Sequence, residues 1–119
     1  MKKSPLLPFR VVNDNDLSAA FTTNPTDARY QDNIMYQIVI ASGGNAVGVL
    51  DVEVSSDYDP KQINAGNWTD LGSAYQATID GVGTGLIMLN QFEAVWMRLK
   101  YTRTSGTSTM NAYVSGKQV

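Results

Sequence analysis

Carboxylates and aromatic rings are the groups in this sequence that could do chemistry, because its 119 residues include neither histidine nor cysteine. Without these two residue types the chain cannot build a Ser-His-Asp or Cys-His arrangement, a disulfide or a thiolate metal site. Hydrolysis of a glycoside by two carboxylates needs a cleft between them, and a single domain of this length has little depth for one. We therefore expect a protein that is not an enzyme.

Acidic residues flank Tyr58, which lies between Asp57 and Asp59. Oxygen ligands of this kind suit calcium, but neither this segment nor the Asp-Asn-Asp run at residues 14–16 has the spaced, glycine-containing loop of an EF-hand. Side chains of Asp and Asn in such runs mostly bond to their own backbone in turns. We expect neither a metal nor another cofactor.

Trp68 gives the same region a second interpretation. A tryptophan ring can stack on a sugar or hold an apolar side chain of a partner, and it can equally anchor a loop on the core. In the first case Asp57, Tyr58 and Trp68 would form the platform of a carbohydrate- or host-surface-binding module. We keep this as the alternative function.

A second group of candidates lies on the strand predicted for residues 95–102. Apolar residues alternate there with polar ones, and Trp96 falls on the polar side together with Arg98 and Lys100. Aromatic residues and arginine are enriched at interface hot spots, so this side either packs within the molecule or contacts a partner. Under the second interpretation the partner contacts are Trp96, Arg98, Lys100 and Arg103.

Glycines at positions 81, 83 and 85 resemble a phosphate-binding loop only in composition. The lysine and hydroxyl residue of a P-loop are missing and no helix is predicted to follow, so nothing would hold an anion. We interpret residues 81–85 as the tip of a hairpin.

Charge is distributed in blocks, although the net charge is only −2. Residues 1–50 are neutral, residues 51–93 carry seven acidic residues and one lysine, and residues 94–119 carry four basic residues and no acid. Neighbouring strands of one molecule, or complementary surfaces of two, could balance these blocks. Four basic residues are too few for a nucleic-acid footprint, and no apolar stretch reaches the length of a membrane helix.

The elements that position these residues are predicted to be short β-strands. No segment shows a helical period, whereas apolar residues alternate or run together between turn residues at roughly 8–12-residue spacing. We expect about seven to nine strands in an antiparallel β-sandwich, a small barrel being the other arrangement. The segment Val95–Ser115 is predicted to be a hairpin that turns at Gly106, where glycine supplies a positive φ.

The first third of the chain shows weaker order signals, because Pro5, Pro8 and the Asn-Pro pair at 24–25 interrupt it. We predict an N-terminal arm and the first strand or strands over residues 1–33, and a β-sandwich body over residues 34–119, in one domain. Pro5, Pro8 and Arg10 break the apolar stretch that a signal peptide would need, so we expect no signal peptide.

Proline-containing, polar termini are often mobile until a partner orders them. The predicted arm would therefore contact a neighbouring molecule through its apolar residues. These residues are Leu6, Leu7 and Phe9.

Three segments carry a resemblance to known proteins: Asn67–Leu71, Trp96–Thr107 and Asn111–Lys117. Together they make roughly residues 34–117 resemble a group of small tailed-bacteriophage proteins described as virion structural proteins. A looser similarity, based on the Trp68-Thr69 pair and a late strand with Arg98, links the chain to discoidin-like sandwich domains, which are usually longer and often carry a cysteine pair. The two resemblances imply an antiparallel sandwich that is jelly-roll-like or discoidin-like.

These observations lead us to expect a non-enzymatic virion structural protein of a tailed phage, made in the host cytoplasm and located in the virion. The role implied by the resemblance is capsid decoration (cement), or that of a head–tail accessory protein. The expected partners are the major capsid protein or other virion proteins, and further copies of the chain in a homo-oligomer such as a trimer. We expect no contact with nucleic acid or membrane.

Overall fold

The computed structural model describes residues 6–41, 44–61, 65–81, 83–90 and 95–118. These residues form ten β-strands and one short 3-10 helix. The elements are β1 (Leu6–Asp16), β2 (Phe21–Thr22), β3 (Thr26–Asp27), β4 (Asn33–Ile40), β5 (Val47–Ser55), β6 (Thr69–Asp70), η1 (Ser73–Tyr75), β7 (Gln76–Asp80), β8 (Gly83–Leu89), β9 (Trp96–Ser105) and β10 (Thr109–Lys117). No helix of the described part is long and apolar enough to cross a membrane.

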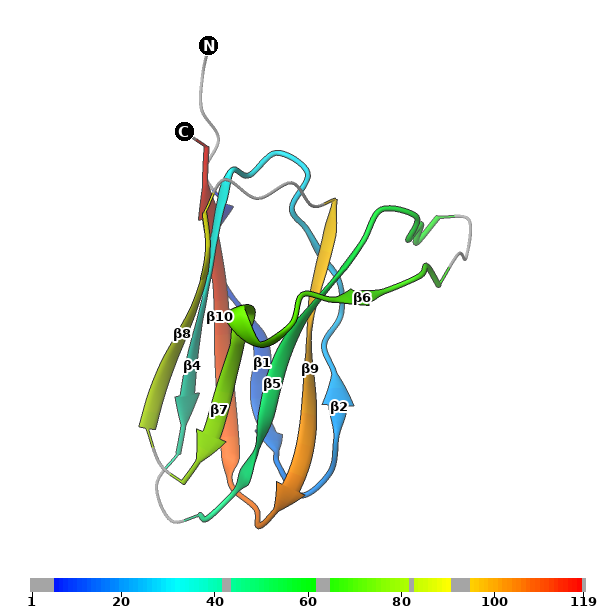
Figure 1. The fold of residues 1–119 in the computed structure, drawn as a ribbon. Helices are drawn as coiled ribbons and strands as arrows, with labels where there is room; N and C mark the ends of the chain where they lie inside the picture. Colours follow the sequence, from blue (N-terminus) through cyan, green and yellow to red (C-terminus); the bar gives the residue numbers. More distant parts are fainter. Residues whose placement is uncertain (1–5, 42–43, 62–64, 82, 91–94, 119) are drawn as a thin grey trace.

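The strands form two sheets that face each other (Figure 1). One sheet has four strands in the order β1-β10-β4-β8, and the other has six, in which β2 and β3 pair with β9, and β6 and β7 pair with β5. All of these pairings are antiparallel. The predicted antiparallel β-sandwich is thus confirmed, and the additional strands are the two-residue pieces β2, β3 and β6.

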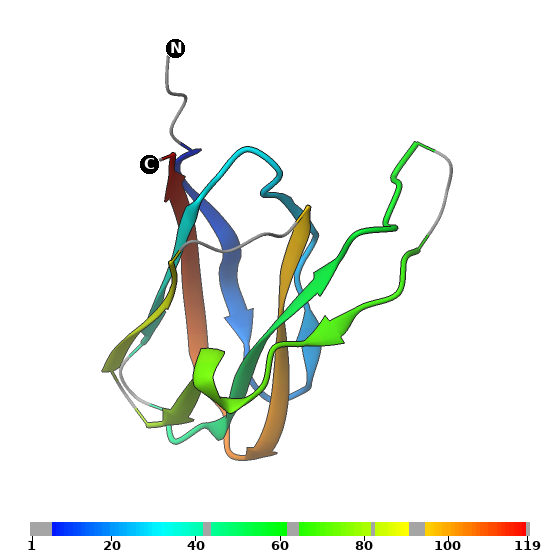
Figure 2. The same cartoon turned by 45° about the horizontal axis from the view of Figure 1, so that its top comes forward.

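The chain changes sheet at almost every connection between long strands. It passes from β4 to β5, from β7 to β8, from β8 to β9 and from β9 to β10 by crossing from one sheet to the other. In the turned view of Figure 2, the turn between β9 and β10 joins the two sheets at one end of the sandwich. Such wrapping, with the last strand between the first and the fourth, is the jelly-roll arrangement.

The predicted hairpin over Val95–Ser115 is wrong, because its two strands belong to different sheets. β9 pairs with β5 and β10 pairs with β1 and β4, so the turn at Gly106 joins the sheets across the core. Gly106 has the predicted positive φ, at 71°. The turn between β7 and β8 likewise joins opposite sheets and is not a hairpin tip. Turn residues mark where a chain reverses, but they do not tell which partner the next strand finds.

The predicted arm is also corrected by the structure. β1 begins at Leu6 and pairs with β10 from Leu6 opposite Gly116 to Asp16 opposite Thr109. Val12 on this strand is buried in the core, and Leu6 packs against the core. Residues 6–33 are therefore part of the sandwich, and the rest of the predicted arm, residues 1–5, lies outside the described residues.

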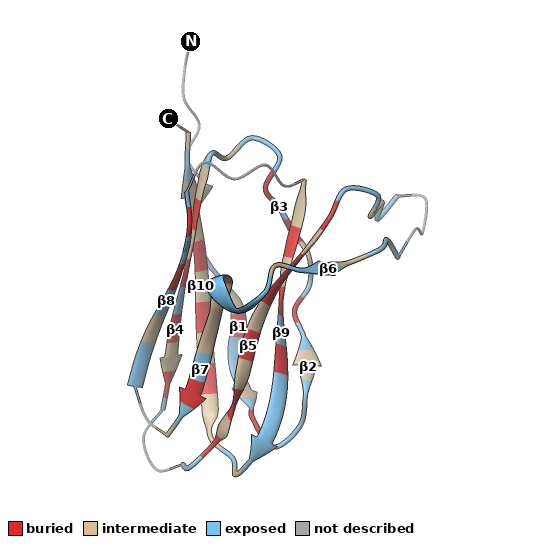
Figure 3. Ribbon diagram, in the orientation of Figure 1, coloured by how far each residue is buried: buried red, intermediate tan, exposed pale blue. Residues whose placement is uncertain are grey.

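The core lies between the two sheets, and residues buried in it alternate with less buried ones along the long strands (Figure 3). Each sheet contributes a buried row: Tyr36, Ile38, Met110, Ala112 and Val114 from the four-stranded sheet, and Leu50, Val52, Met97, Leu99 and Tyr101 from the six-stranded sheet. Burial of apolar side chains in both rows is the main stabilising contribution to the fold. The residues between them point outward and form the two outer faces, which differ in character.

Candidate binding site

Residues from both sequence-predicted groups meet on the outer face of the six-stranded sheet. Tyr58 and Trp68 come from the segment between β5 and β6, which projects from the sheet in Figure 2, and Trp96 comes from the start of β9. The ring of Tyr58 lies 5.0 Å from that of Trp96 in an edge-on arrangement and 5.7 Å from that of Trp68. We call Tyr58, Trp68 and Trp96 the aromatic cluster.

Arg98 joins the aromatic cluster to the sheet. Its guanidinium lies over the ring of Trp68, 4.1 Å from the ring centre, and its Nε donates a 2.8 Å hydrogen bond to Oε1 of Glu53. Glu53 lies directly opposite Arg98 on β5 and is only 8% exposed. A carboxylate so buried needs a paired charge, so this ion pair is a structural contact within the chain rather than a contact to a partner.

Asp57 stabilises the segment between β5 and β6 by accepting hydrogen bonds from nearby residues. One carboxylate oxygen accepts hydrogen bonds from Ser55 Oγ at 2.8 Å and from the Asn67 backbone at 2.7 Å, and the other accepts from Asn67 Nδ2 at 2.6 Å. Donation by the Asn67 backbone, by its side chain and by Ser55 lowers the pKa of Asp57 to about 2. Donors to the charged form have this effect. Because both carboxylate oxygens have partners, Asp57 serves the loop rather than a ligand.

A pocket of about 520 Å³ opens beside the aromatic cluster. Its walls include Tyr58, Lys61 and Trp96, and Arg29, which arrives from the connection between β3 and β4. Arg29 pairs with Asp27 at 2.9 Å and lies over the ring of Trp96 at 5.8 Å. The hydrogen bond and the charge of Asp27 raise the pKa of Arg29. The two cations, the carboxylates of Asp57 and Asp59 and the two aromatic rings that line this pocket can hold a small polar molecule.

The other predicted contact residues lie elsewhere. Lys100 is exposed on β9 opposite Asp51. The pKa of Asp51 is raised, first by burial and then by the charge of Asp70, although the charge of Lys100 acts to lower it. Arg103 donates a 2.9 Å hydrogen bond to the Gly106 carbonyl in the turn after β9. The acidic and basic blocks of the sequence therefore meet, in part, between β5 and β9 of one molecule.

Leu6, Leu7 and Phe9 lie on β1, at the edge of the opposite sheet. Leu6 is half-buried against the core, whereas Leu7 is 72% and Phe9 42% exposed. These three residues thus form no common site with the aromatic cluster, and the predicted contact set divides into separate places.

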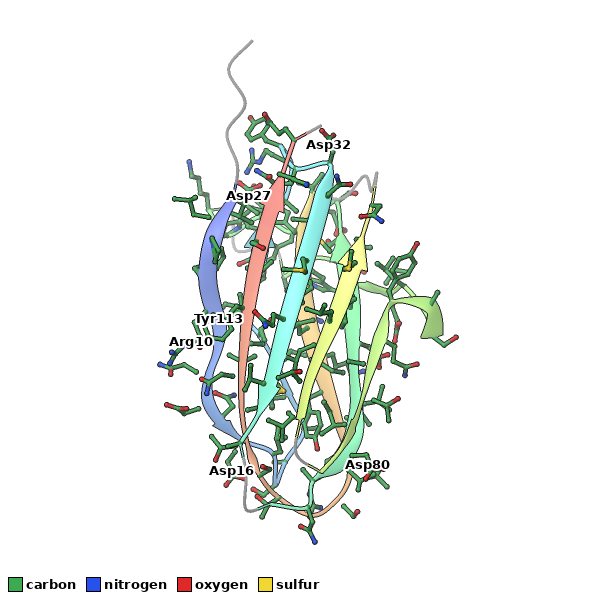
Figure 4. All side chains as sticks on the ribbon, turned by 90° about the vertical axis from the view of Figure 1, so that its left-hand side faces the viewer. Arg10, Asp16, Asp27, Asp32, Asp80 and Tyr113 are labelled. Atoms are coloured by element: carbon green, nitrogen blue, oxygen red, sulfur yellow. The ribbon has the colours of Figure 1, made fainter. Side chains whose placement is uncertain are left out.

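Sequence reasoning missed the outer face of the four-stranded sheet, onto which Figure 4 looks. Met35 on β4 lies opposite Met88 on β8, and the next outward position of β8 is Leu86, opposite Gln37. Met88 is 54% and Leu86 56% exposed. We call Met35, Val39, Leu86, Met88 and Tyr113 the outer apolar face. The signal was the apolar character of β4, which only Gln37 interrupts between Ile34 and Ile40, because a strand that is apolar on both sides is typically covered on both.

A shallow hollow of about 380 Å³ lies at one end of this face, between Met35, Met88 and Ser115. Among the described residues, no group of three or more acidic residues is placed to hold a metal ion. No protein-family model matches the chain, and no curated protein matches it either.

Proposed function

We propose that this chain is a non-enzymatic virion structural protein of a tailed phage, a capsid decoration or head–tail accessory protein that acts through protein–protein contacts. The resemblance of residues 34–117 to phage virion proteins suggests the setting. The single observation that supports an assembly role is the outer apolar face, where Leu86 and Met88 are more than half exposed.

An exposed apolar patch on a folded domain commonly marks a surface that contacts another molecule. The outer apolar face lies on strands that pair in continuous register. By contrast, the aromatic cluster on the other sheet is largely occupied by contacts within the chain. Leu7 and Phe9 are further exposed apolar residues, on β1 at the other edge of the same sheet, so they remain proposed contacts, from a strand instead of an arm.

The virion assignment is tested on purified particles of the phage that encodes the chain. We expect mass spectrometry to find the chain in virions after density-gradient purification, and immunogold labelling to place it on the head or at the head–tail junction. Its presence in infected cells together with its absence from particles would contradict the proposal.

The contact surface is tested by sedimenting the chain with particles that lack it. A Met35→Lys variant places a charge on the outer apolar face and is expected to reduce binding at least tenfold. Thr102→Lys, an exposed position on the outer side of β9, is the matched control and should bind as the unmodified chain does. Equal binding by both variants would exclude the outer apolar face as the contact.

A carbohydrate- or host-surface-binding function is the second candidate, and the pocket lined by Arg29, Tyr58 and Trp96 favours it. A glycan array tests it with Arg29→Ala, because the Arg29 side chain is 46% exposed and the substitution is expected to leave the fold intact. A specific sugar signal that this variant loses would favour the second candidate. Trp68→Ala is the weaker probe, since Trp68 packs against Arg98.

A further inference from the structure

The edge of the four-stranded sheet at β8 lacks the features that usually protect a sheet edge. β8, Gly83–Leu89, pairs with β4 on one side only. Its seven residues include no charged residue and no proline. Its hydrogen-bonding register with β4 is continuous over its whole length. A regular, uncharged, apolar edge strand is a template for pairing with another strand.

The other edges of the sandwich are protected. β1 carries Pro8, Arg10 and Asp14, has a positive φ of 48° at Asp14, and shows three register shifts against β10. On the six-stranded sheet, the edge pieces β2, β3 and β6 are two residues long, and β7 ends in Asp80. Short strands, bulges, proline and charge all discourage pairing. The contrast singles out β8 among the described edges.

The exposed side chains of β8 are the ones that a further strand would cover. Thr84, Leu86 and Met88 point to the outer face, since their partners on β4 are the outward residues Val39, Gln37 and Met35. Side chains directly opposite on an antiparallel pair have their Cβ atoms roughly 4.5–5.5 Å apart. A strand laid along β8 would thus bury Leu86 and Met88, which no other part of the described chain covers.

We propose that the occupant of this edge is β8 of a second copy of the chain, paired antiparallel about a two-fold axis near Leu86. Both strands of such a pair are neutral, so no like charges meet. Leu86 of one copy then packs on Leu86 of the other copy or on the residues next to it. A two-fold contact of identical edges closes on itself. The two four-stranded sheets then form one sheet of twice the number of strands, and the outer apolar face continues across the axis.

The oligomeric state gives the first test. Sedimentation velocity over about 1 to 100 µM is expected to show a species of twice the monomer mass that grows with concentration. Leu86→Lys places two like charges opposite each other at the axis and should weaken the dimer at least tenfold. Leu7→Lys introduces the same charge on the exposed position of the opposite edge and should leave the dimer unchanged. Circular dichroism checks that both variants keep the fold.

A single cysteine gives the second test, because the chain contains no other. In registers centred on residues 85, 86 or 87, position 86 lies directly opposite or diagonal to its own copy. Leu86→Cys treated with a short bismaleimide is expected to form a covalent dimer at low micromolar concentration, whereas Leu7→Cys is not. This readout separates edge pairing from stacking of two outer faces, for which Val39→Cys, one strand further in, would react as well as Leu86→Cys.

A chain that stays monomeric over the whole concentration range would overturn the proposal, and so would a dimer that is insensitive to Leu86→Lys. Either result leaves the virion assignment untouched, because that assignment depends on finding the chain in particles. Conversely, a β8-paired dimer that is absent from virions would contradict the proposed function and not the pairing.

Discussion

At the scale of single residues, side chains that were candidates for binding a ligand make structural contacts within the chain. Asp57, Trp68 and Arg98 are residue types that commonly bind ligands, and each is occupied by neighbours in its own chain. The sequence identified the residue types correctly. Ser55 is only two residues from Asp57, but Asn67 and Glu53 are reached only through the fold. Spacing along the chain carries no information on these two contacts, because one depends on how the loop between β5 and β6 folds back and the other on the pairing of β5 with β9.

Asp57 makes the stability of this loop depend on pH. Its pKa is about 2 in the folded protein, against 3.8 for the free side chain, so the carboxylate stabilises the fold above pH 3.8. That contribution is lost as the pH falls from about 4 through 2. We expect the fluorescence of the adjacent tryptophans to change in this window, ahead of global unfolding. Asp57→Asn should remove the change, and an unaltered acid profile in this variant would refute the assignment.

Arg98 is predicted to be a stability residue and not a contact residue. Arg98→Ala removes the stack on Trp68 and leaves the buried Glu53 without its partner, which should lower the free energy of unfolding by about 2–3 kcal/mol. Lys100→Ala, on the same strand and face but exposed, should change it by less than about 0.5 kcal/mol. Urea denaturation measures both. Equal effects would mean that the burial of Glu53 has no energetic consequence.

At the scale of elements, the positions of strands could be predicted but their partners could not. Alternation over Val95–Tyr101 and the apolar run over Ile34–Ile40 placed β9 and β4 correctly. The pairing of β1 with β10, and of β9 with β5, joins residues that are far apart in sequence. Local patterns set which face of a strand is buried, whereas the sheet it joins is decided by packing of the whole core.

Gly106 offers a test of the turn that joins the two sheets. A Cβ at this position would collide with the Asn45 carbonyl, and its φ is 71°. Gly106→Ala should therefore lower stability by more than about 2 kcal/mol, combining backbone strain with the collision. Gly81→Ala has a similar φ of 78° but open space around the added Cβ, so it isolates the strain alone. Thermal unfolding should show a clearly smaller loss for Gly81→Ala, and equal losses would rule out the collision.

At the scale of the whole molecule, the candidate contact residues lie on two outer faces and not on one common surface. The six-stranded sheet carries the aromatic cluster, held mainly by contacts within the chain, and the four-stranded sheet carries the exposed apolar residues. The charge blocks and the two tryptophans pointed to the first face. The second face was not predicted, because methionine and leucine on the outer side of β4 and β8 cannot be told from core residues in a sequence.

The last strand is predicted to be indispensable for the fold. β10 lies between β1 and β4 and contributes Met110, Ala112 and Val114 to the core. A chain that ends after Ser108 should therefore give the circular dichroism spectrum and the proton NMR spectrum of an unfolded protein. A chain that ends after Lys117 keeps all of β10 and should fold. A folded structure in the shorter chain would contradict the central role of this strand.

The place of β10 also has a consequence for synthesis in the cell. β10 lies between β1 and β4 in the four-stranded sheet but follows both in the sequence, so β1 and β4 have no strand between them until β10 has left the ribosome. Contacts between such distant segments also form slowly. The nascent chain should thus remain open, with the apolar strand β8 accessible to chaperones, until β10 is available. Folding of the sandwich is expected to wait for the synthesis of β10.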